Sequence, residues 1–165
     1  MGLPCRLCCV AGEITVMKIN LGCGYRKRPD CVNIDNRPKV EPDLVCDGSK
    51  LPYDDNSVDV VYAMDYLEHI PIGKTIDQIN EIWRVLKNGG VFIHKTPSTD
   101  GRGAFQDPTH VSFWNINSWL YYMDDNYRNL YGIVAKFEGS LEDVWTGKVC
   151  HTKGILTAVK NGEKI

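Results

Sequence analysis

A glycine-rich turn between two short apolar segments lies near the start of the chain. The turn is part of Lys18-Ile-Asn-Leu-Gly-Cys-Gly24, and the second segment, Val32-Asn-Ile-Asp35, ends in a carboxylate. Gly22 and Gly24 allow the backbone to approach a ligand where a Cβ would collide. A strand, a glycine turn and a second strand ending in an acidic residue predict an α/β protein, in which Asp35 can accept hydrogen bonds from ribose hydroxyls.

The spacing in this region argues against a dinucleotide site. A dinucleotide fingerprint has a third glycine, and this chain has Lys27 in its place. The interval from Gly24 to Asp35 is too short for the usual first crossover helix. The connection is therefore predicted to be a basic loop, without a long helix to direct its dipole at a pyrophosphate. A ligand with a nucleoside and no phosphates, such as S-adenosylmethionine (SAM), fits better.

Further motifs follow in an order that closely resembles the class I SAM-dependent methyltransferases. They are Asp43-Leu-Val-Cys-Asp47, the segment 51–63, Leu67-Glu-His69 and the segment 81–93. With the first two segments the resemblance covers residues 17 to 97, and linked motifs at this spacing are far more specific than any single one. The resemblance implies SAM as the cofactor, S-adenosylhomocysteine as its product, and a Rossmann-like sheet.

The resemblance also implies which residues bind the cofactor. Asp35 would bind the ribose, Asp47 would lie beside the adenine amino group, and the residues after the fourth strand would line the sulfonium and the tail of the methyl donor. The expected set is Asn20, Leu21, Gly22, Cys23, Gly24, Asp35, Asn36, Asp47, Gly48, Met64, Asp65 and Tyr66. The short first loop departs from the family pattern, so the partner of the cofactor's carboxylate is sought among Arg26, Lys27 and Arg28.

Hydrophobic periodicity predicts the strands and one long helix. Strands are expected near 17–21, 31–35, 43–46, 58–63 and 91–96. A helix is expected over about 75–87, because apolar residues recur there at three- and four-residue intervals and Gly89-Gly90 follows. The expected fold is α/β and Rossmann-like, with a mostly parallel sheet, an antiparallel edge strand and a shortened first crossover.

The carboxyl-terminal part is predicted to complete the sheet. A short helix is expected from about 118 to 123, and two alternating stretches, 132–137 and 154–160, are expected to form an antiparallel hairpin. Between these stretches, Trp145 could line a substrate pocket, but burial is the simpler interpretation.

An irregular polar segment from 97 to 115 is predicted to close over the methyl donor. Its Asp107-Pro-Thr-His110 also resembles a loop found in a group of small SAM-dependent methyltransferases. If the acceptor is a hydroxyl or an amine, a base must take its proton, and His110 is the natural candidate, with Asp107 as its partner. The alternative is that His110 only bonds Asp107 and holds the loop in shape.

One acidic and histidine-bearing segment raises the question of a metal. Asp65, Glu68 and His69 would share one face if a helix begins there, and some quinone-pathway O-methyltransferases resemble this arrangement and hold a divalent cation with it. Such an element also occurs where it merely packs and caps a turn. We expect no metal, with these three residues as the candidates if one binds. His94 and His151 are expected to be structural.

Length and composition predict one globular domain over residues 17–165, preceded by a disordered or dispensable extension of residues 1–16. The 165 residues are 43% hydrophobic and 24% charged. A formal net charge of −2 makes nucleic acid an unlikely partner. The odd cysteine count of seven, without an apolar segment of membrane or signal-peptide type, predicts a cytoplasmic protein with no membrane partner.

The expected function is methyl transfer from SAM to an oxygen or nitrogen of a small-molecule acceptor. Little of the chain is left for a cap domain, so the acceptor pocket would come from the 97–115 loop, the edge hairpin or a partner subunit, as in a homodimer. Two other functions stay open. The chain could bind SAM without catalysis, or it could be a nicotinamide-dependent oxidoreductase, which the missing third glycine and the short crossover disfavour.

Overall fold

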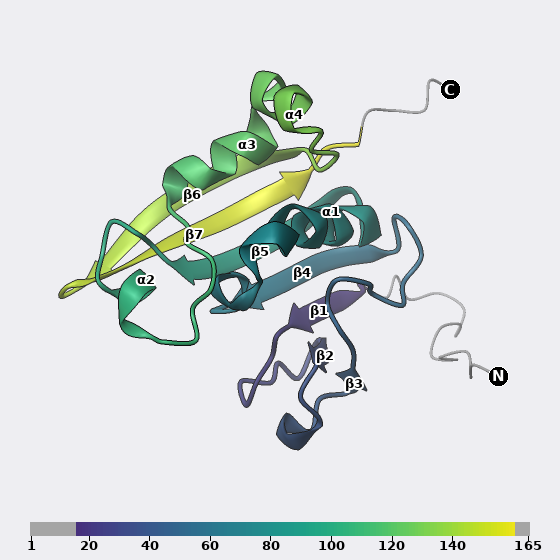
Figure 1. The fold of residues 1–165 in the computed structure, drawn as a ribbon. Coiled ribbons are helices and arrows are strands. Elements are labelled where there is room, and N and C mark those ends of the chain that lie inside the picture. Colours follow the sequence, from purple (N-terminus) through teal and green to yellow (C-terminus); the bar gives the residue numbers. More distant parts are fainter. Residues whose placement is uncertain (1–15, 161–165) are drawn as a thin grey trace, which may run out of the picture.

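The computed structural model describes residues 16–160, so the predicted extension of residues 1–16 lies almost wholly outside the described residues. The described chain forms one seven-stranded sheet in the order β3-β2-β1-β4-β5-β7-β6 (Figure 1). The strands are β1 (Lys18–Leu21), β2 (Val32–Asp35), β3 (Leu44–Val45), β4 (Val58–Met64), β5 (Leu86–Pro97), β6 (Phe137–Thr146) and β7 (Val149–Ala158). The first five run parallel, whereas β7 is antiparallel to both β5 and β6. The predicted fold class is confirmed.

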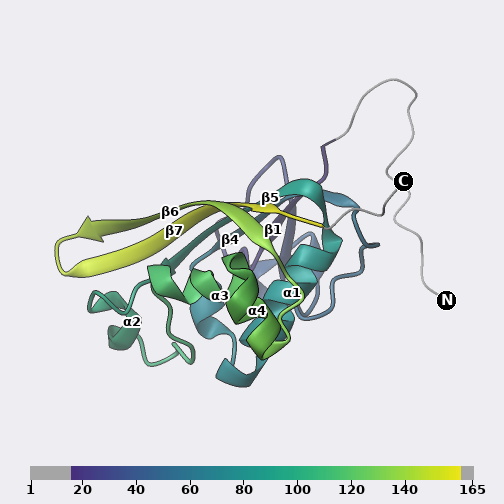
Figure 2. The same ribbon diagram turned by 90° about the horizontal axis from the view of Figure 1, so that it is seen from above.

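The helices lie together on one face of this sheet (Figure 2). They are α1 (Thr75–Val85), α2 (Gly103–Gln106), α3 (Leu120–Met123) and α4 (Asp125–Tyr131), with short 3₁₀ turns at η1 (Pro38–Val40), η2 (Leu67–His69), η3 (Ile72–Lys74) and η4 (Ile116–Trp119). No helix within residues 16–160 is both long and apolar enough to cross a membrane.

The connection between β1 and β2 contains turns and no helix, as the short interval predicted. The Asn33 side chain holds this loop from the second strand. Its amide donates to the carbonyls of Arg28 and Cys31, and its oxygen accepts from the Arg28 N–H and the Asn20 amide. Because these groups are paired internally, the loop keeps its shape without a crossover helix.

Helix α1 packs its apolar stripe on the sheet through Ile79, Ile82 and Val85, which are fully buried. The helix ends at Val85 instead of 87, because Leu86 is already extended and pairs with Val58 as the first residue of β5. Gly89 and Gly90 thus lie inside β5 and do not end the helix. This corrects the predicted boundary.

The predicted carboxyl-terminal hairpin is wrong in position. Helix α4 continues to Tyr131 and is ended by Gly132 at φ 63°, so 132–136 is no strand and β6 begins only at Phe137. Most of the other predicted stretch, 154–160, does lie in β7. The hairpin instead pairs β6 with β7 around Gly147, at φ 61°. The segment predicted to connect the two strands therefore belongs mostly to β6 and β7. The hairpin tip projects beyond the rest of the sheet (Figure 2). Trp145 near this tip is 56% exposed, which corrects the expectation that it is buried.

The loop between β3 and β4 is fastened to α1 by Arg84. The guanidinium donates to the carbonyls of Leu51 and Tyr53, at 3.1 and 2.9 Å, and forms ion pairs with Glu81 and Asp55. Glu81 in turn accepts from the Leu51 N–H at 2.6 Å. The Arg84 side chain therefore fixes the conformation of the loop between β3 and β4.

Replacing Arg84 with Met should lower the free energy of unfolding by about 2 to 3 kcal/mol, because partly buried carbonyls lose a charged donor. Urea denaturation of the variant and of Arg102→Met, which changes an exposed arginine, measures the difference. Equal stability of the two variants would contradict the fastening role.

Candidate functional site

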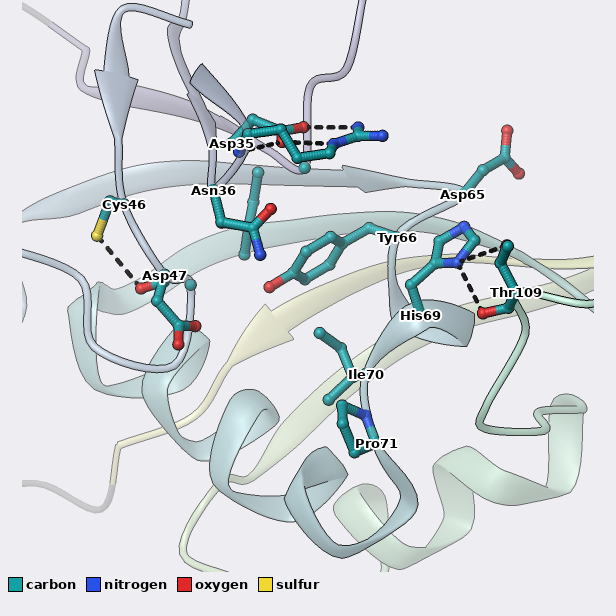
Figure 3. Close-up of a pocket in the computed structure, with 14 residues that line it drawn as sticks. Asp35, Asn36, Cys46, Asp47, Asp65, Tyr66, His69, Ile70, Pro71 and Thr109 are labelled. Carbon is teal, nitrogen blue, oxygen red and sulfur yellow. Dashed lines mark hydrogen bonds and ion pairs between the residues drawn. The ribbon is translucent and has the colours of Figure 1, made fainter. Parts of the chain in front are cut away.

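A cavity of about 470 Å³ opens at the carboxyl ends of β1, β2 and β4 (Figure 3). We call it the first cavity. It is lined by Leu21, Gly22, Asp35, Asn36, Arg37, Cys46, Asp47, Gly48, Asp65, Tyr66, His69, Ile70, Pro71 and Thr109. Open α/β sheets bind ligands outside the carboxyl ends of their strands, and the volume lies in the range of small-molecule sites.

The Tyr66 ring crosses the first cavity between two glycines. A Cβ at Gly22, whose φ is 64°, would collide with the ring, and a Cβ at Gly48 would collide with the hydroxyl. The hydroxyl donates to the Gln78 side-chain oxygen at 3.0 Å, while the Gln78 amide donates to the Gly48 carbonyl at 2.8 Å. In Figure 3 the ring extends from the side of His69 toward that of Asp47. Both glycines are therefore required for the shape of this cavity.

Asp35 is a buried carboxylate at the end of β2, only 4% exposed. Its Oδ2 accepts from the Gly24 N–H at 2.9 Å, and its Oδ1 accepts from the Arg37 N–H at 3.0 Å. The Arg37 guanidinium adds a two-pronged ion pair, with Nε to Oδ1 at 2.9 Å and Nη2 to Oδ2 at 3.1 Å. Burial alone would raise the pKa of Asp35, but the bonds from Arg37 and Gly24 outweigh it, so this pKa is lowered and the group is ionised.

Asp65, directly after β4, gathers three basic side chains. Its Oδ2 pairs with Lys95 at 2.8 Å and with Arg26 at 3.1 Å, and its Oδ1 lies 3.9 Å from the His151 imidazole. That Oδ1 is buried and makes no hydrogen bond within residues 16–160, and the backbone of Asp65 is left-handed, at φ 52°. Strained backbone and an unsatisfied acceptor at the edge of a cavity are typical of functional positions.

Glu68, His69 and His110 meet beside the first cavity, and we call them the Glu68 cluster. One donor atom from each lies within 4.8 Å of the other two. The two imidazole rings pack edge to face, with centroids 5.2 Å apart. Glu68 is 2% exposed, and burial raises its pKa; its Oε2 accepts from the Thr96 hydroxyl at 2.9 Å. Asp65, one of the three candidates from the sequence, is not part of this group, whereas His110 is.

The predicted catalytic pair lies beside the first cavity but does not line it. Asp107 accepts from the N–H and hydroxyl of Thr109, at 2.8 and 2.7 Å, and lies 3.8 Å from the His110 Nε2. The His110 Nδ1 contacts the Ala104 carbonyl at 3.1 Å. In this segment Thr109 reaches the cavity. A catalytic role for Asp107 and His110 stays a prediction.

Most of the predicted cofactor-binding residues line the first cavity. Those that do are Leu21, Gly22, Asp35, Asn36, Asp47, Gly48, Asp65 and Tyr66. The other four do not line the cavity. Asn20 and Gly24 support its loops, because Asn20 donates to the Arg26 carbonyl and the Gly24 N–H donates to Asp35. Cys23 and Met64 lie outside the cavity lining.

Sequence reasoning missed the other lining residues, Arg37, Cys46, His69, Ile70, Pro71 and Thr109, as site residues for the cofactor, and it also missed Lys95. A signal was available for Arg37, which follows Asp35 by two positions, where its side chain can return to the carboxylate. His151 reaches Asp65 only through the pairing of β7 with β5, which the misplaced hairpin concealed.

The basic residues of the loop after β1 make different contacts. Arg28 lies over the Tyr62 ring, 4.0 Å from its centroid. The Arg26 guanidinium is exposed and reaches Asp65 at the cavity. Among the three candidates for binding a carboxylate at the first cavity, Arg26 is the one paired with a lining residue.

A second cavity of about 380 Å³ adjoins the first along the chain, since Pro71 lines one and Ile72 the other. It is lined by Ile72, Thr75, Ile76, Ser112, Phe113, Trp114, Ser118, Tyr121, Tyr122, Tyr131 and Ile133. This lining is mainly apolar and aromatic, with hydroxyl groups, as in sites for small organic ligands.

Comparisons with known proteins agree with this geometry. The family described as "Methyltransferase domain" matches residues 19–94, which run from β1 to the middle of β5. No curated protein matches the sequence.

Several solved structures share the fold. A putative methyltransferase of Haloferax volcanii, in complex with the Trm112 methyltransferase activator, is 16% identical with a TM-score of 0.67, over 93% of this chain and 86% of that one. A SAM-dependent methyltransferase of Methanosarcina mazei is 14% identical with a TM-score of 0.64, over 88% and 93%. The 1,6-didemethyltoxoflavin-N1-methyltransferase of Burkholderia thailandensis, with bound 1,6-didemethyltoxoflavin and S-adenosylhomocysteine, is 11% identical with a TM-score of 0.62, over 87% and 71%.

Proposed function

Because the family described as "Methyltransferase domain" matches residues 19–94 and known SAM-dependent methyltransferases share the fold, we propose that this chain is a class I SAM-dependent methyltransferase that transfers a methyl group from SAM to an oxygen or nitrogen of a small molecule. The observation that carries the proposal is the first cavity, where a buried, ionised Asp35 and the exposed Asp47 follow neighbouring strands. Carboxylates at these two places suit the hydroxyl and amino groups of an adenosine, which are hydrogen-bond donors.

The residues present fit SAM. Asp35 would accept from the ribose hydroxyls, and Asp47 would lie beside the adenine. Arg26 would pair with the carboxylate of the amino-acid end, and the unsatisfied Oδ1 of Asp65 would accept from its ammonium group. When bound, SAM supplies a methyl group already activated by the positive sulfonium.

The contribution of the protein is mainly alignment. A displacement at carbon needs acceptor, methyl and sulfur in line, and holding reactants in such geometry supplies several kcal/mol of barrier reduction. We assign the acceptor to the second cavity, whose aromatic lining favours a planar or apolar small molecule. The proposal of a small acceptor is also consistent with the 1,6-didemethyltoxoflavin bound in the Burkholderia neighbour.

Proton removal from the acceptor is assigned to the segment 107–110. His110 keeps Nδ1 on the Ala104 carbonyl, so Nε2 is the nitrogen that can take a proton, and Asp107 stands beside it. Since only Thr109 of this segment lines the first cavity, His110 can act as the base only if the segment shifts toward the acceptor.

Calorimetric titration with SAM, S-adenosylhomocysteine and NAD tests the cofactor assignment. We expect micromolar binding of both adenosyl ligands and none of NAD, because the first loop has no helix for a pyrophosphate. Preferential NAD binding, or binding of neither adenosyl ligand, would contradict the proposal.

A second assay follows methyl transfer from labelled SAM to a panel of small phenols, amines and heterocycles. Turnover of any of them supports a small acceptor. SAM binding without turnover on any acceptor tested would favour a SAM-binding protein without catalysis.

A further inference from the structure

We propose that the Glu68 cluster is a binding site for a divalent transition-metal ion, with Glu68, His69 and His110 as its three protein ligands. It is the one group of three such side chains with mutually close donor atoms in the described part of the chain, residues 16–160. Two imidazoles and one carboxylate are a ligand set used for zinc and iron.

Both imidazoles are oriented as metal ligands usually are. The Nδ1 of His69 lies 3.3 Å from the Thr109 carbonyl, and the Nδ1 of His110 lies 3.1 Å from the Ala104 carbonyl. A carbonyl oxygen only accepts, so a proton on each Nδ1 satisfies these contacts and leaves a lone pair on each Nε2. The Thr109 hydroxyl also lies 3.4 Å from the His69 Nδ1, but it donates to Asp107 at 2.7 Å. Metal-binding histidines characteristically donate their second N–H to a backbone carbonyl or a carboxylate, which fixes the ring and its tautomer.

Glu68 brings the negative charge that the two neutral rings lack. Its side chain is buried, and its Oε2 is held by the Thr96 hydroxyl. Among the described residues, Glu68 forms no ion pair with a lysine or arginine. A buried carboxylate without a cationic partner is costly, and a bound cation removes that cost.

The donor atoms need only a small contraction to bind an ion. Zinc bonds of about 2.0 to 2.2 Å place tetrahedral donors roughly 3.4 Å apart, compared with the present limit of 4.8 Å. Glu68 and His69 both lie in η2, where Glu68 is buried and His69 is exposed. His110 belongs to the loop after α2. Neither histidine lies in a strand, so bringing the donor atoms together requires no change in the sheet.

The site would stand at the edge of the first cavity, because His69 and Thr109 line it. Three protein ligands leave at least one coordination position open, as in catalytic zinc sites. An acceptor oxygen bound there would lose its proton more readily, and His110 would then act as a ligand instead of a base. This role in acceptor binding rests on the proposed function, whereas the metal site itself does not.

Titration of the chelator-treated full chain with Co²⁺ and Zn²⁺ tests the site directly. We expect one Co²⁺ per chain, with visible d–d absorption and no thiolate charge-transfer band, and displacement by Zn²⁺. Glu68→Gln and His110→Gln should each weaken the affinity by at least about 100-fold. His151→Gln is the matched control, since it changes an imidazole outside the cluster, and it should bind Co²⁺ like the parent protein.

The outcomes separate this inference from the proposed function. Absence of Co²⁺ binding, a thiolate band, or unchanged affinity in both cluster variants would overturn the metal site, even if SAM still binds. Metal binding without SAM binding would support the site and contradict the function. If Glu68→Gln does not fold, His110→Gln in the loop decides, with thermal melting as its folding control.

Discussion

Between pH 6.5 and about 4, the free energy of unfolding should fall by roughly 1.4 kcal/mol per pH unit because of His94 alone. This side chain lies in β5, is 1% exposed and stacks on Trp119 with ring centroids 3.9 Å apart. Among the described residues, neither of its nitrogens has a hydrogen-bond partner. Burial lowers the pKa of His94 to about 3, compared with an ordinary value of 6.5.

The sign follows from proton uptake. Below pH 6.5 the unfolded chain protonates this imidazole, whereas the folded chain does so only near pH 3. The stability contributed by His94 is therefore fully present above pH 6.5 and is lost as the pH falls. The total loss reaches about 5 kcal/mol near pH 3. That is comparable to the whole stability of many domains, so unfolding in weak acid is expected.

Urea denaturation across this pH range measures the slope in the parent protein and in His94→Phe, which keeps a ring against Trp119. The variant should lose most of the slope. Other groups also titrate: the raised pKa of Glu68 works in the opposite direction, and burial together with Lys95 lowers the pKa of His151. His151→Gln is the control and should remove only a minor part. An unchanged slope in His94→Phe would contradict the assignment.

Asp35→Asn should weaken SAM binding by about 1.5 to 3 kcal/mol, or roughly 10- to 150-fold, if Asp35 accepts from the ribose. The amide keeps the shape of the side chain but loses its charge and half of its acceptor capacity. Arg37 loses its partner at the same time, and the Gly24 N–H loses a carboxylate acceptor. The loss therefore affects both the ligand contact and the turn that shapes the cavity.

Calorimetry with SAM measures this change, and Asp43→Asn provides the matched control. Asp43 also accepts from a β2 residue, at the N–H and side-chain amide of Asn33, both at 2.8 Å, but it does not line the cavity. We expect Asp43→Asn to alter stability and leave SAM affinity unchanged. Equal affinities in the two variants would contradict the ribose assignment.

The sequence predicted the first half of the sheet well because its signals there are local. Gly22 has the left-handed φ of 64° that glycine adopts readily, and Asp35 ends a strand whose apolar residues are adjacent to it in the sequence. Leu21 and Gly22 of this turn and Asp35 at the end of that strand all line the first cavity. The same locality explains the prediction of helix α1, whose apolar stripe lies within one segment.

The second half was harder because its contacts depend on strand register. The alternation in 137–146 belongs to an edge strand that is mostly exposed, so apolar periodicity marks it poorly. Lys95 and His151 meet Asp65 only after β5 has paired with β4 and β7. No sequence pattern around Lys95 or His151 indicates that either side chain will contact Asp65 at the end of β4.

The ion pair between Asp35 and Arg37 has a thermodynamic consequence for every ligand of the first cavity. A ribose bound at Asp35 as proposed would compete with the Arg37 guanidinium for the same two oxygens. The apparent affinity would then be the intrinsic affinity multiplied by the fraction of molecules in which Arg37 is dissociated from Asp35. If that fraction is about 1%, the apparent Kd is roughly 100-fold weaker than the intrinsic one. The Arg37 side chain is 55% exposed but the Asp35 side chain only 3%, so salt screens this partly buried pair weakly and the competition persists at moderate ionic strength.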